Sequence, residues 1–552
     1  MMRKLTHMLG AVLLLVACGK GGEEPTVRPE TVPGVPQNVV LHGATETSLT
    51  FQWDAVKDAA NYLWKLSQDG EEVKNGSVMQ RNVTINGLTP GTVYGFCVCA
   101  SGVAGDSDYS AVVQARTEGT PPDPSATKVC VDAPVVVTFD TEPSLGDSGI
   151  ITVCKADGTV VDQISLADKA KVNVLEDGTM VPKEQIKSGT ASHSFMDVLT
   201  CSGKTRSVHY TPYRIKGKKL LIRLHSGVLA FDTNYTVKLD DEVLSTFTTK
   251  PAPSSDQWLR VSADGNADFC TVQGALSYAN SKGCDISIAP GTYQELLYLR
   301  DKANIALRGD SRDAVRIAYP NSEVYAEGTS ARCLFLVENC NNLILDHLTL
   351  ENTFTSSDHK GQAETIYFNS GDNSHRLTVE SCALFSWQDT FLCKGQVWVH
   401  KSLIAGHCDF IWGYPKVCLF EECEIRARAA GYIVQARVPN ESDKGFVFLN
   451  CNLTGDSGYK EGSMYLARSG GDSGVYDNVV FVNCTLTQVI ATAGWYTNPA
   501  PNPSAPTATS GWREYGSVDP SGKAITTHNA YGKVLTDSEV AGYTSKKAIL
   551  NW

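Results

Sequence analysis

Two aspartates stand at matching positions of a repeated pattern in the C-terminal half of the chain, and paired carboxylates can share acid–base or nucleophilic chemistry. Asp389 lies within Gln388–Thr390, and Asp409 opens the segment Asp409–Gly413, 20 residues further on. Two carboxyl groups held close together disturb each other's ionisation, because like charges favour keeping one proton between them. Such a pair divides into one acid and one base or nucleophile.

The elements that must position these acids are indicated by a repeat of short apolar runs, each followed by a polar and then a small residue. The small residue falls at Cys382, Ser402, Cys423, Cys451 and Cys484, at intervals of 20 to 33 residues. Such periods are typical of solenoids, whose coils contribute short parallel strands. Stacked strands lie about 4.8 Å apart, so acids at the same phase of successive coils become neighbours. The alternative is that both aspartates are turn residues on a solvated face.

Residues from about 255 to 530 resemble carbohydrate esterase family 8, the pectin methylesterases. The likeness begins at Ala289–Glu295 and continues through Leu307–Asp310 and Leu350–Thr353. Segments like those of the family's active site then follow in the family's order: Gln362-Ala363, Gln388–Thr390, Asp409–Gly413, Leu466–Arg468, Gly494-Trp495 and Glu514–Gly516. One such triplet is a weak signal, whereas their joint order and spacing is a specific one. The resemblance implies an all-β catalytic domain, a right-handed parallel β-helix.

The resemblance also implies a role for each of five residues. Asp409 would be the nucleophile that attacks the C6 carboxymethyl carbonyl of a galacturonate unit. Asp389 would protonate the departing methanol and then activate water as a base. Gln362 and Gln388 carry amides able to donate hydrogen bonds to the oxyanion, and Arg468 would orient Asp409 and hold it ionised. Polar strand-end residues are the alternative for the two glutamines.

One motif departs from the family, in which the arginine is followed by proline and a substrate-stacking tryptophan. Here Arg468 is followed by Ser469 and glycines, so that tryptophan is missing. Trp387, Trp412 and Trp495 adjoin the matched motifs and are predicted to offer sugar-stacking faces, with core packing as the alternative.

Other functions for the same residues remain open. Carboxylates about 5 Å apart also suit a retaining glycosidase, and β-helices host pectin hydrolases and lyases. A catalytically inactive carbohydrate-binding surface protein is a third reading, because the segment after Arg468 is altered. The two glutamines favour the esterase, since glycosidic chemistry requires no oxyanion hole. We expect no cofactor and no metal, because the eleven cysteines from Cys270 onward form no zinc-like C-x-x-C pairs.

The length of the chain suggests several domains, and its net charge bears on the kind of partner that it binds. The chain has 552 residues and a net charge of −12, which argues against a nucleic-acid partner. Residues 34–118 resemble a fibronectin type III domain, residues 127–251 are predicted to form an immunoglobulin-like spacer, and residues 252–552 the pectinesterase-like β-helix. Neither upstream module shows a catalytic constellation. We therefore expect the part from about Ala252 to fold and work alone, as a monomer acting on pectin.

The N-terminus resembles a bacterial lipoprotein signal peptide. Arg3 and Lys4 precede an apolar stretch from Met8 to Ala17, and Cys18 follows at the position that is lipidated after cleavage. This predicts a signal peptide over 1–17, a lipidated tether over 18–33, and an exported lipoprotein anchored in the outer membrane through acyl chains. An ordinary secretory signal with an incidental cysteine is the alternative.

Overall fold

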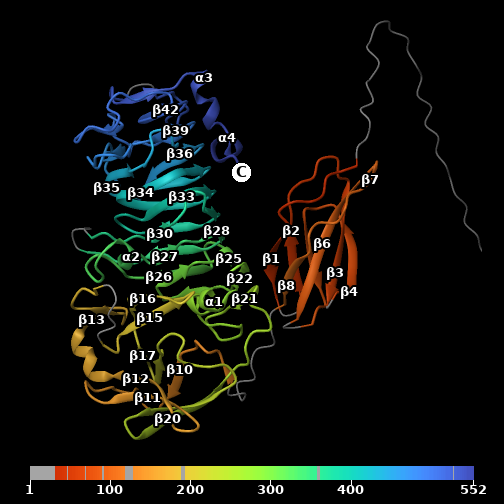
Figure 1. Cartoon of the computed structure of the whole chain (residues 1–552), viewed down its shortest axis with the longest axis vertical. Coiled ribbons are helices and arrows are strands. Elements are labelled where there is room, and N and C mark those ends of the chain that lie inside the picture. The colour runs from red at the N-terminus through yellow and green to blue at the C-terminus, as the bar shows by residue number, and fades with distance from the viewer. Residues whose placement is uncertain are drawn as a thin grey trace, which may run out of the picture. The chain divides into compact units, whose positions relative to one another are not determined.

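The computed structural model describes residues 32–45, 48–68, 70–89, 92–117, 128–187, 193–356, 361–525 and 528–552. The predicted signal peptide and Cys18 lie outside these residues. The chain divides into two compact units, one formed mainly by Thr50–Thr84 and Tyr94–Gln114 and the other mainly by Ala115–Trp552 (Figure 1). Within the described ranges, no helix is both long and apolar enough to cross a membrane.

The N-terminal part of the described chain, up to Arg116, forms a β-sandwich of short strands. One sheet joins β1 (Val40–Ala44), β2 (Ser48–Gln52) and β5 (Asn82–Asn86). The other joins β3 (Asn61–Gln68), β4 (Glu71–Val78), β6 (Val93–Gly102), β7 (Gly105–Asp106) and β8 (Val113–Arg116). The rings of Phe51 and Phe96, one from each sheet, stack with centroids 4.0 Å apart, so alternate apolar positions of both sheets close one core.

The second unit begins with another pair of sheets, here called the second sandwich. Its larger sheet holds β9 (Lys128–Val129), β11 (Ile150–Lys155), β12 (Val160–Ser165), β19 (Asn234–Leu239) and β20 (Glu242–Thr249). Its smaller sheet holds β10 (Val135–Thr138), β17 (Tyr213–Lys216) and β18 (Lys219–Ile222). Buried Val153 and Val237 from the larger sheet share a core with Val137 and Leu220 from the smaller.

Two hairpins and one short helix extend the second sandwich. The helix is η1 (Leu166–Lys171), the first hairpin joins β13 (Val172–Val174) to β14 (Met180–Pro182), and the second joins β15 (Met196–Cys201) to β16 (Lys204–His209). The β15–β16 hairpin carries apolar side chains that do not belong to the sandwich core. Leu199, Cys201 and Val208 lie instead in the hydrophobic core of the solenoid that follows.

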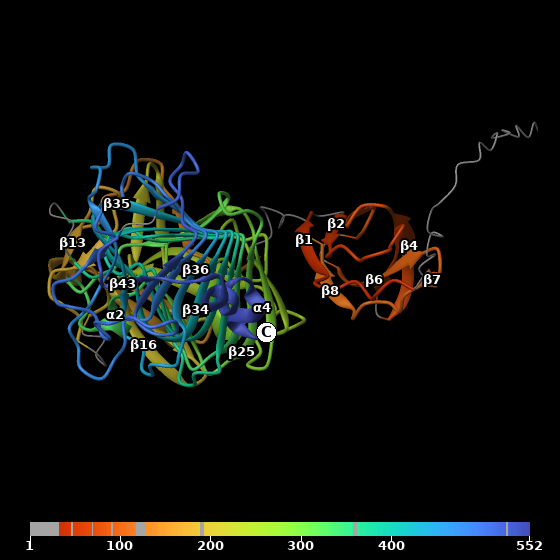
Figure 2. The same ribbon diagram turned by 90° about the horizontal axis from the view of Figure 1, so that it is seen from above.

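The solenoid is a parallel β-helix, as the repeat predicts. Most strands pair in parallel with the strand three places later in the sequence, for example β22 with β25, β25 with β28 and β28 with β31. One coil therefore contains three strands. Figure 2, which looks along the stack, shows strands of successive coils lying over one another. Its strands are β21 (Trp258–Val261), β22 (Cys284–Ile288), β23 (Gly291–Tyr293), β24 (Leu297–Arg300), β25 (Ala303–Gly309), β26 (Val315–Tyr319), β27 (Phe335–Glu338), β28 (Asn341–Asp346), β29 (Thr349–Asn352), β30 (Ile366–Asn369), β31 (Arg376–Glu380), β32 (Ala383–Phe385), β33 (Phe391–His400), β34 (Leu403–Glu421), β35 (Glu424–Ala436), β36 (Gly445–Leu449), β37 (Asn452–Gly455), β38 (Met464–Arg468), β39 (Val479–Val482), β40 (Thr485–Leu486), β41 (Trp495–Tyr496), β42 (Trp512–Tyr515) and β43 (Gly532–Val534).

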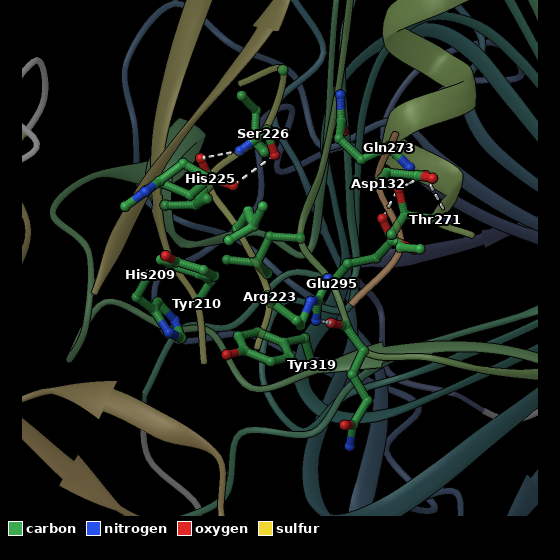
Figure 3. A pocket seen from close by; sticks show the side chains of 18 of the residues that line it. Asp132, His209, Tyr210, Arg223, His225, Ser226, Thr271, Gln273, Glu295 and Tyr319 are labelled. Carbon is green, nitrogen blue, oxygen red and sulfur yellow. Dashed lines mark hydrogen bonds between the residues drawn. The ribbon is translucent and has the colours of Figure 1, made fainter. Parts of the chain in front are cut away.

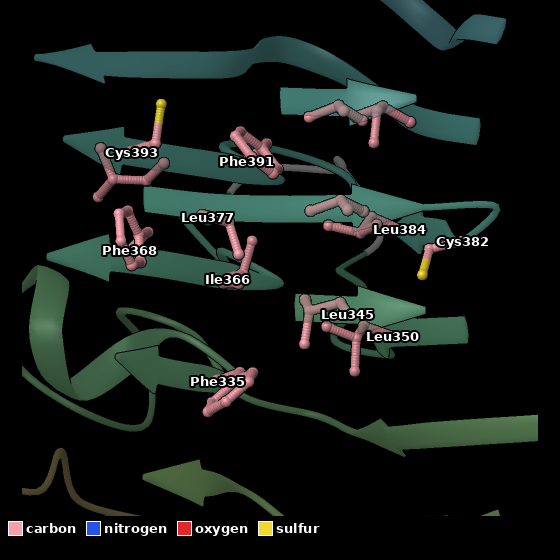
Figure 4. Packing of buried hydrophobic residues seen from close by; sticks show 14 of the residues in the cluster. Phe335, Leu345, Leu350, Ile366, Phe368, Leu377, Cys382, Leu384, Phe391 and Cys393 are labelled. Atoms are coloured by element: carbon pink, nitrogen blue, oxygen red, sulfur yellow. The ribbon is translucent and has the colours of Figure 1, made fainter. Parts of the chain in front are cut away.

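Side chains inside the solenoid form ladders along its axis (Figure 4). Phe335 pairs with Ile366 and Ile366 with Phe391 on three successive coils. Further along, Phe420, Phe448 and Phe481 stack with centroids 4.8 and 4.4 Å apart. The repeated cysteines are buried in this interior, and every cysteine in the described part of the chain is a free thiol. Small thiols therefore fill the corners where larger aliphatic groups would collide.

Short helices cover parts of the solenoid. Helix α1 (Val272–Tyr278) contacts β21 and β24 among the first coils, and α2 (Thr329–Arg332) precedes β27. At the far end, α3 (Asp537–Val540), η2 (Ala541–Tyr543) and α4 (Lys546–Leu550) pack Val540, Tyr543 and Ile549 with Leu419 and Val480 of the sheet. The sheet residues in this second cluster alternate with those pointing inward, so both faces of these strands are buried.

Candidate active site

Strand register brings the two predicted acids together. Phe391 of β33 pairs with Ile411 of β34, which places Asp389 beside Asp409 on adjacent coils. The register continues outward through two isolated bridges, Gln362 with Gln388 and Gln388 with Cys408. Four of the five predicted catalytic residues are therefore neighbours on successive coils, with the glutamines aligned at one position and the aspartates at the next.

Both aspartates adopt a backbone conformation that is uncommon for residues other than glycine. The φ angle is 64° at Asp389 and 47° at Asp409, in the left-handed region that Asp tolerates better than most residues. Their exposed fractions are only 3% and 4%. Two buried acids held in a sparsely populated conformation are typical of functional sites rather than of solvated turns.

Asp409 is held from two sides by donors. Arg468, at the end of β38, donates from Nε to Oδ1 at 2.7 Å and to Oδ2 at 3.0 Å, and its Nη2 also donates to Oδ2. Gln435 of β35 donates from Nε2 to Oδ2 at 3.1 Å. The same hydrogen bonds raise the pKa of Arg468 further above its ordinary value, so the guanidinium keeps its charge. This carboxylate is thus oriented with its lone pairs partly engaged, as a fixed nucleophile requires.

Cys408 directly precedes Asp409 and is the other potential nucleophile at this point. Burial, aided by the negative charge of Asp409, raises the pKa of the Cys408 thiol to about 12. The thiolate is the reactive form of cysteine, so a thiol with this pKa stays protonated and inert at neutral pH.

Asp389 has the opposite environment. Burial raises the pKa of its carboxyl group well above the ordinary value, and the charge of Glu364 raises it further. Arg332 opposes this effect from 3.4 Å, the distance between its Nη2 and Oδ2 of Asp389, but its guanidinium is shared with Glu364. Asp389 is therefore the carboxyl whose protonated form is favoured, and Asp409 the one that is paired with a guanidinium.

Glu364 is a fully buried carboxylate that sequence reasoning did not single out. Arg332 contacts it through Nε at 2.9 Å and through Nη2 at 2.7 Å. Burial raises the pKa of Glu364, and this pairing with Arg332 opposes that rise. Glu364 directly follows the matched segment Gln362-Ala363, so its acidic type was a visible signal. Arg332 lies outside every matched motif, and nothing in the sequence pointed to it.

Gln362 is oriented by the same arginine. Nη1 of Arg332 donates to Oε1 of Gln362 at 2.5 Å, and the backbone carbonyl of Gln362 accepts from the Glu323 N–H at 2.9 Å. With its oxygen occupied, the amide has its Nε2 hydrogens left to donate. The Gln388 backbone carbonyl accepts from Ala363 at 3.3 Å, so the two glutamines are fixed in consecutive coils.

The three predicted stacking tryptophans fall in different places. Trp387 is half-buried, with the Arg428 guanidinium 4.3 Å from its ring centroid. Trp412 is 7% exposed and lies under Arg437 at 5.2 Å. Trp495 is 1% exposed and stacks on Trp512 with centroids 5.3 Å apart. The prediction that Trp495 stacks on a sugar is therefore corrected to core packing.

Three half-buried tyrosines lie next to Arg468. Tyr432, Tyr465 and Tyr496 come from β35, β38 and β41, with centroids 4.9 to 5.9 Å apart. The Arg468 guanidinium lies 5.0 Å from the Tyr432 ring. These ring faces beside the nucleophile were not foreseen, because the three tyrosines are separated by more than 30 residues in pairs and meet only through coil register.

Potential metal ligands come together at one place in the described residues, away from the aspartate pair. Cys130, Asp132 and Cys270 bring one donor atom each within 4.8 Å of one another. Asp132 already accepts hydrogen bonds from the Cys270 N–H at 2.9 Å and from Thr271 at 2.8 and 2.6 Å. The Lys250 ammonium donates to the Ala267 carbonyl that Cys130 also contacts, so a positive charge already occupies this place. Cys130, Asp132 and Cys270 therefore stabilise the contact between the second sandwich and the solenoid.

Comparisons with known proteins agree with this geometry. A family model described as Pectinesterase matches residues 259–551, and one described as Fibronectin type III domain matches residues 34–116. Pectinesterase 31 of Arabidopsis thaliana is 30% identical over 264 residues, which are 44% of this chain and 78% of that protein. Pectinesterase/pectinesterase inhibitor U1 of Solanum lycopersicum is 27% identical over 251 residues, 43% of this chain and 41% of that protein.

Solved structures of pectin methylesterases also align with this chain. Pectin methylesterase PemA from Erwinia chrysanthemi aligns over 55% of this chain and 98% of its own at 22% identity, with a TM-score of 0.45. The structure titled pectin methylesterase from carrot aligns over 53% and 92% at 21% identity, also with a TM-score of 0.45. The resemblances stated for both modules are confirmed by the family models, and this chain belongs to the pectinesterase family.

Proposed function

We propose that the solenoid hydrolyses the methyl esters of homogalacturonan, releasing methanol and leaving pectate. The observation that carries the proposal is the division between the two aspartates. Asp409 lies between Arg468 and Gln435 as a paired carboxylate, whereas Asp389 is buried beside Glu364 with a raised pKa. Ester hydrolysis through a covalent intermediate requires one acid in each of these states at the same time.

The first half of the reaction forms an acyl-enzyme. An oxygen of the Asp409 carboxylate attacks the ester carbonyl carbon, and the carbonyl oxygen becomes an oxyanion that accepts hydrogen bonds from the side-chain amides of Gln362 and Gln388. When the oxyanion collapses, the bond to the methoxy oxygen breaks and Asp389 delivers its proton to that oxygen. Methanol leaves, the substrate acyl group is joined to Asp409 as an anhydride, and Asp389 is left ionised.

The second half restores the enzyme. Asp389 takes a proton from water, whose oxygen attacks the galacturonyl carbonyl of the anhydride. The tetrahedral intermediate again directs its oxyanion to the two glutamines, then expels the Asp409 carboxylate and leaves a free galacturonate carboxyl group. Asp389 is protonated again, so the two acids return to their starting states. Arg468 and Gln435 favour the departing carboxylate, because both donate to its oxygens.

Aromatic and cationic groups around the acids suit an oligosaccharide with some free carboxylates. The tyrosines 432, 465 and 496 and the half-buried Trp387 offer ring faces on which sugar rings can stack. Arg428 and Arg437 lie over tryptophan rings at distances of 4.3 and 5.2 Å, and each guanidinium is also paired with an aspartate, Asp456 at 3.6 Å and Asp472 at 3.0 Å. We infer that these groups replace the tryptophan that is missing after Arg468.

The test separates the esterase from the other enzymes that act on pectin. Purified protein is incubated with highly methylated homogalacturonan, and methanol, reducing ends and unsaturated ends are measured in the same samples. The esterase releases methanol without new ends. New reducing ends would indicate a glycosidase, unsaturated ends a lyase, and no product at all a binding protein, and each of these results contradicts the proposal.

We also propose that the enzyme is an exported lipoprotein of the outer membrane. The support is the order of charged residues, apolar stretch and Cys18, followed by a segment rich in Gly, Glu and Pro. The fibronectin type III domain and the second sandwich would then stand between the anchor and the solenoid, which works as a monomer without a cofactor.

A further inference from the structure

The second sandwich is built into the first coils of the solenoid. Asp132 caps the start of α1 through Thr271, and Arg223 donates from Nη1 to the Gln294 carbonyl at 2.5 Å. Between these contacts lies a small polar cavity of about 70 Å³ (Figure 3). Side chains of both parts line it, including His225 and Glu295. A cavity of this size holds a few waters at most, so the contact is a packed joint rather than a ligand site.

Arg206 of β16 crosses this joint completely. Its exposed fraction is 5%, and the two terminal nitrogens of its guanidinium donate to backbone carbonyls and to the Cys333 thiol of the solenoid, whereas its buried Nε has no hydrogen-bond partner among the described residues. Nη1 donates to the Leu297 carbonyl at 2.6 Å, and Nη2 donates to the carbonyls of Ala331 at 3.1 Å and Cys333 at 2.5 Å. Burial lowers the pKa of Arg206, so desolvation opposes its charge. Burial of a guanidinium is favourable only where several hydrogen bonds together offset the free energy of its desolvation.

Two of these carbonyls flank Arg332, the residue that orients the active site. Arg332 reaches Gln362, Glu364 and Asp389 from α2, a helix of four residues that has little rigidity of its own. Arg206 binds the carbonyl of the Ala331–Arg332 peptide unit and that of the Cys333–Leu334 unit, and together with Asn321, which donates to the same two carbonyls at 2.9 and 3.0 Å, it holds the chain on both sides of Arg332. The position of the Arg332 guanidinium therefore depends on a residue of another module.

A second contact holds the segment that leads into α2. Nε2 of Gln185 donates to the Glu323 carbonyl at 2.5 Å. Ile186 pairs with Ala326 in a parallel bridge, donating to the Tyr325 carbonyl at 2.8 Å and accepting from the Glu327 N–H at 2.9 Å. Glu323 is itself 3.0 Å from Nη1 of Arg332. The second sandwich thus grips the segment 323–333 at both ends.

We propose that Arg206 is a positioning residue of the esterase site, and that the second sandwich is part of the catalytic unit rather than the spacer that its sequence predicts. Arg206 acts by holding Arg332. Arg332 in turn binds Oε1 of Gln362, so that this oxygen points away from the oxyanion and the amide hydrogens of Gln362 point toward the oxyanion. The inference rests on the proposed esterase function for its kinetic test. Misplacing a catalytic group by about 1 Å from a distance can cost roughly 100-fold in rate.

The kinetic test is a double-mutant cycle. Arg206→Met, Arg332→Met and the double variant are assayed on methylated homogalacturonan. Arg206→Met is expected to lower kcat about 10- to 100-fold with KM little changed. The double variant is expected to be no slower than Arg332→Met alone, because one residue acts through the other. The proposal is overturned if the rate losses of the two single variants multiply in the double variant, or if Arg206→Met is fully active. Lys204→Ala, on an exposed position of the same hairpin, is the matched control.

A second variant and a second readout cover loss of folding and loss of the proposed function. Gln185 is exposed and contacts Glu323, so Gln185→Ala keeps the buried joint and is expected to lower kcat a few-fold, again without adding to Arg332→Met. Amide hydrogen exchange is measured in parallel. The probes are the amides of Leu334 and Phe335, which donate to the carbonyls of Glu364 and Thr365. Exchange at these two amides should be faster in Arg206→Met than in the unmodified protein. If Arg206→Met does not fold, the same change is expected in Gln185→Ala. Strands β39 and β42 should be unchanged.

These readouts separate the two claims. If the unmodified protein releases no methanol, the esterase proposal fails, and the exchange data still decide whether Arg206 holds the α2 segment. Unchanged exchange at Leu334 and Phe335 overturns the positioning role whatever the activity.

Discussion

Gln435 donates from Nε2 to Oδ2 of Asp409 at 3.1 Å, on the same oxygen that receives Arg468. Gln435 is 5% exposed and pairs with Trp412 in the register of β34 and β35. The nucleophile is therefore positioned by two coils beyond its own, through one charged and one neutral donor. No matched motif contains Gln435, so this contact became visible only with the register.

Gln435→Leu is expected to lower kcat about 10- to 100-fold, since a hydrogen bond to a charged group contributes roughly 1.5–3 kcal/mol. Gln435→Glu should be slower still, because it keeps the shape but places a second carboxylate against Asp409. Steady-state methanol release gives kcat and KM for both. Gln488→Leu, at an exposed position of the same solenoid, is the control. Equal activity of the Leu and Glu variants would argue against an electrostatic role.

Asp409→Asn and Asp389→Asn are each expected to lose at least about 1,000-fold in methanol release, because each removes a group that takes part in bond making or proton transfer. Both keep the side-chain shape, and Asn tolerates the positive φ at these positions. Asp313→Asn, with a side chain 93% exposed, should be fully active. An Asp409→Asn protein with a tenth of the activity would rule out Asp409 as the nucleophile.

Thermal unfolding of Asp389→Asn provides an independent check on the same variant. The pKa of Asp389 is raised in the folded protein, so ionisation costs folding free energy once the pH exceeds the ordinary Asp value of 3.8. The contribution of Asp389 to stability therefore falls as pH rises above that value, and the variant lacks this loss while keeping those of the other buried carboxyls, such as Glu295. Its Tm should exceed that of the wild type at pH 8 and approach it at pH 4.

The sequence predicted those parts of the site that recur with the coil, and missed those that do not. Asp389 and Asp409 share one phase of a visible repeat, so their proximity followed from the period, whereas Gln362 and Gln388 were named from the family resemblance. Arg332 comes from a short helix between strands and reaches the site because the segment 323–333 is held from another module. No local pattern encodes such a contact. Trp495 failed differently, because adjacency to a motif says nothing about which face of a strand a ring occupies.

The alkaline limit of activity should depend on Glu364. Asp389 acts as an acid only while protonated, so kcat/KM falls as pH rises through its pKa. Glu364→Gln removes a nearby negative charge and frees Arg332 to pair with Asp389, and both changes lower that pKa. The alkaline limb of the pH profile should therefore move to lower pH. Glu461→Gln, on an exposed turn, should leave the profile unchanged. A shift to higher pH would show that Glu364 does not act on Asp389.

Attachment to the membrane is expected to be independent of hydrolysis. Cys18→Ser should move the protein from the membrane fraction to the aqueous fraction, since acyl chains contribute about 0.8 kcal/mol per buried CH₂. Methanol release by the two forms on dissolved pectin should be equal, because the proposed catalytic residues lie far along the chain from Cys18. Fractionation followed by assay of each fraction measures both quantities. A Cys18→Ser protein that stays in the membrane pellet would contradict the lipoprotein prediction.

Two truncated chains should behave differently, although the sequence alone predicts the same result for both. A chain starting at Lys128 keeps the second sandwich and should fold with full activity. A chain starting at Ala252 loses Arg206, which leaves the Ala331 and Cys333 carbonyls without that buried donor, and it loses Leu199, Cys201 and Val208 from the solenoid core. Both carbonyls keep Nδ2 of Asn321 as a donor, at 2.9 and 3.0 Å, so the main loss of stability comes from the buried apolar contacts. The shorter chain is therefore expected to unfold at lower temperature and, where folded, to release methanol at least about 10-fold more slowly. Circular dichroism and methanol assays on both chains measure this, and equal activity would restore the spacer role to the second sandwich.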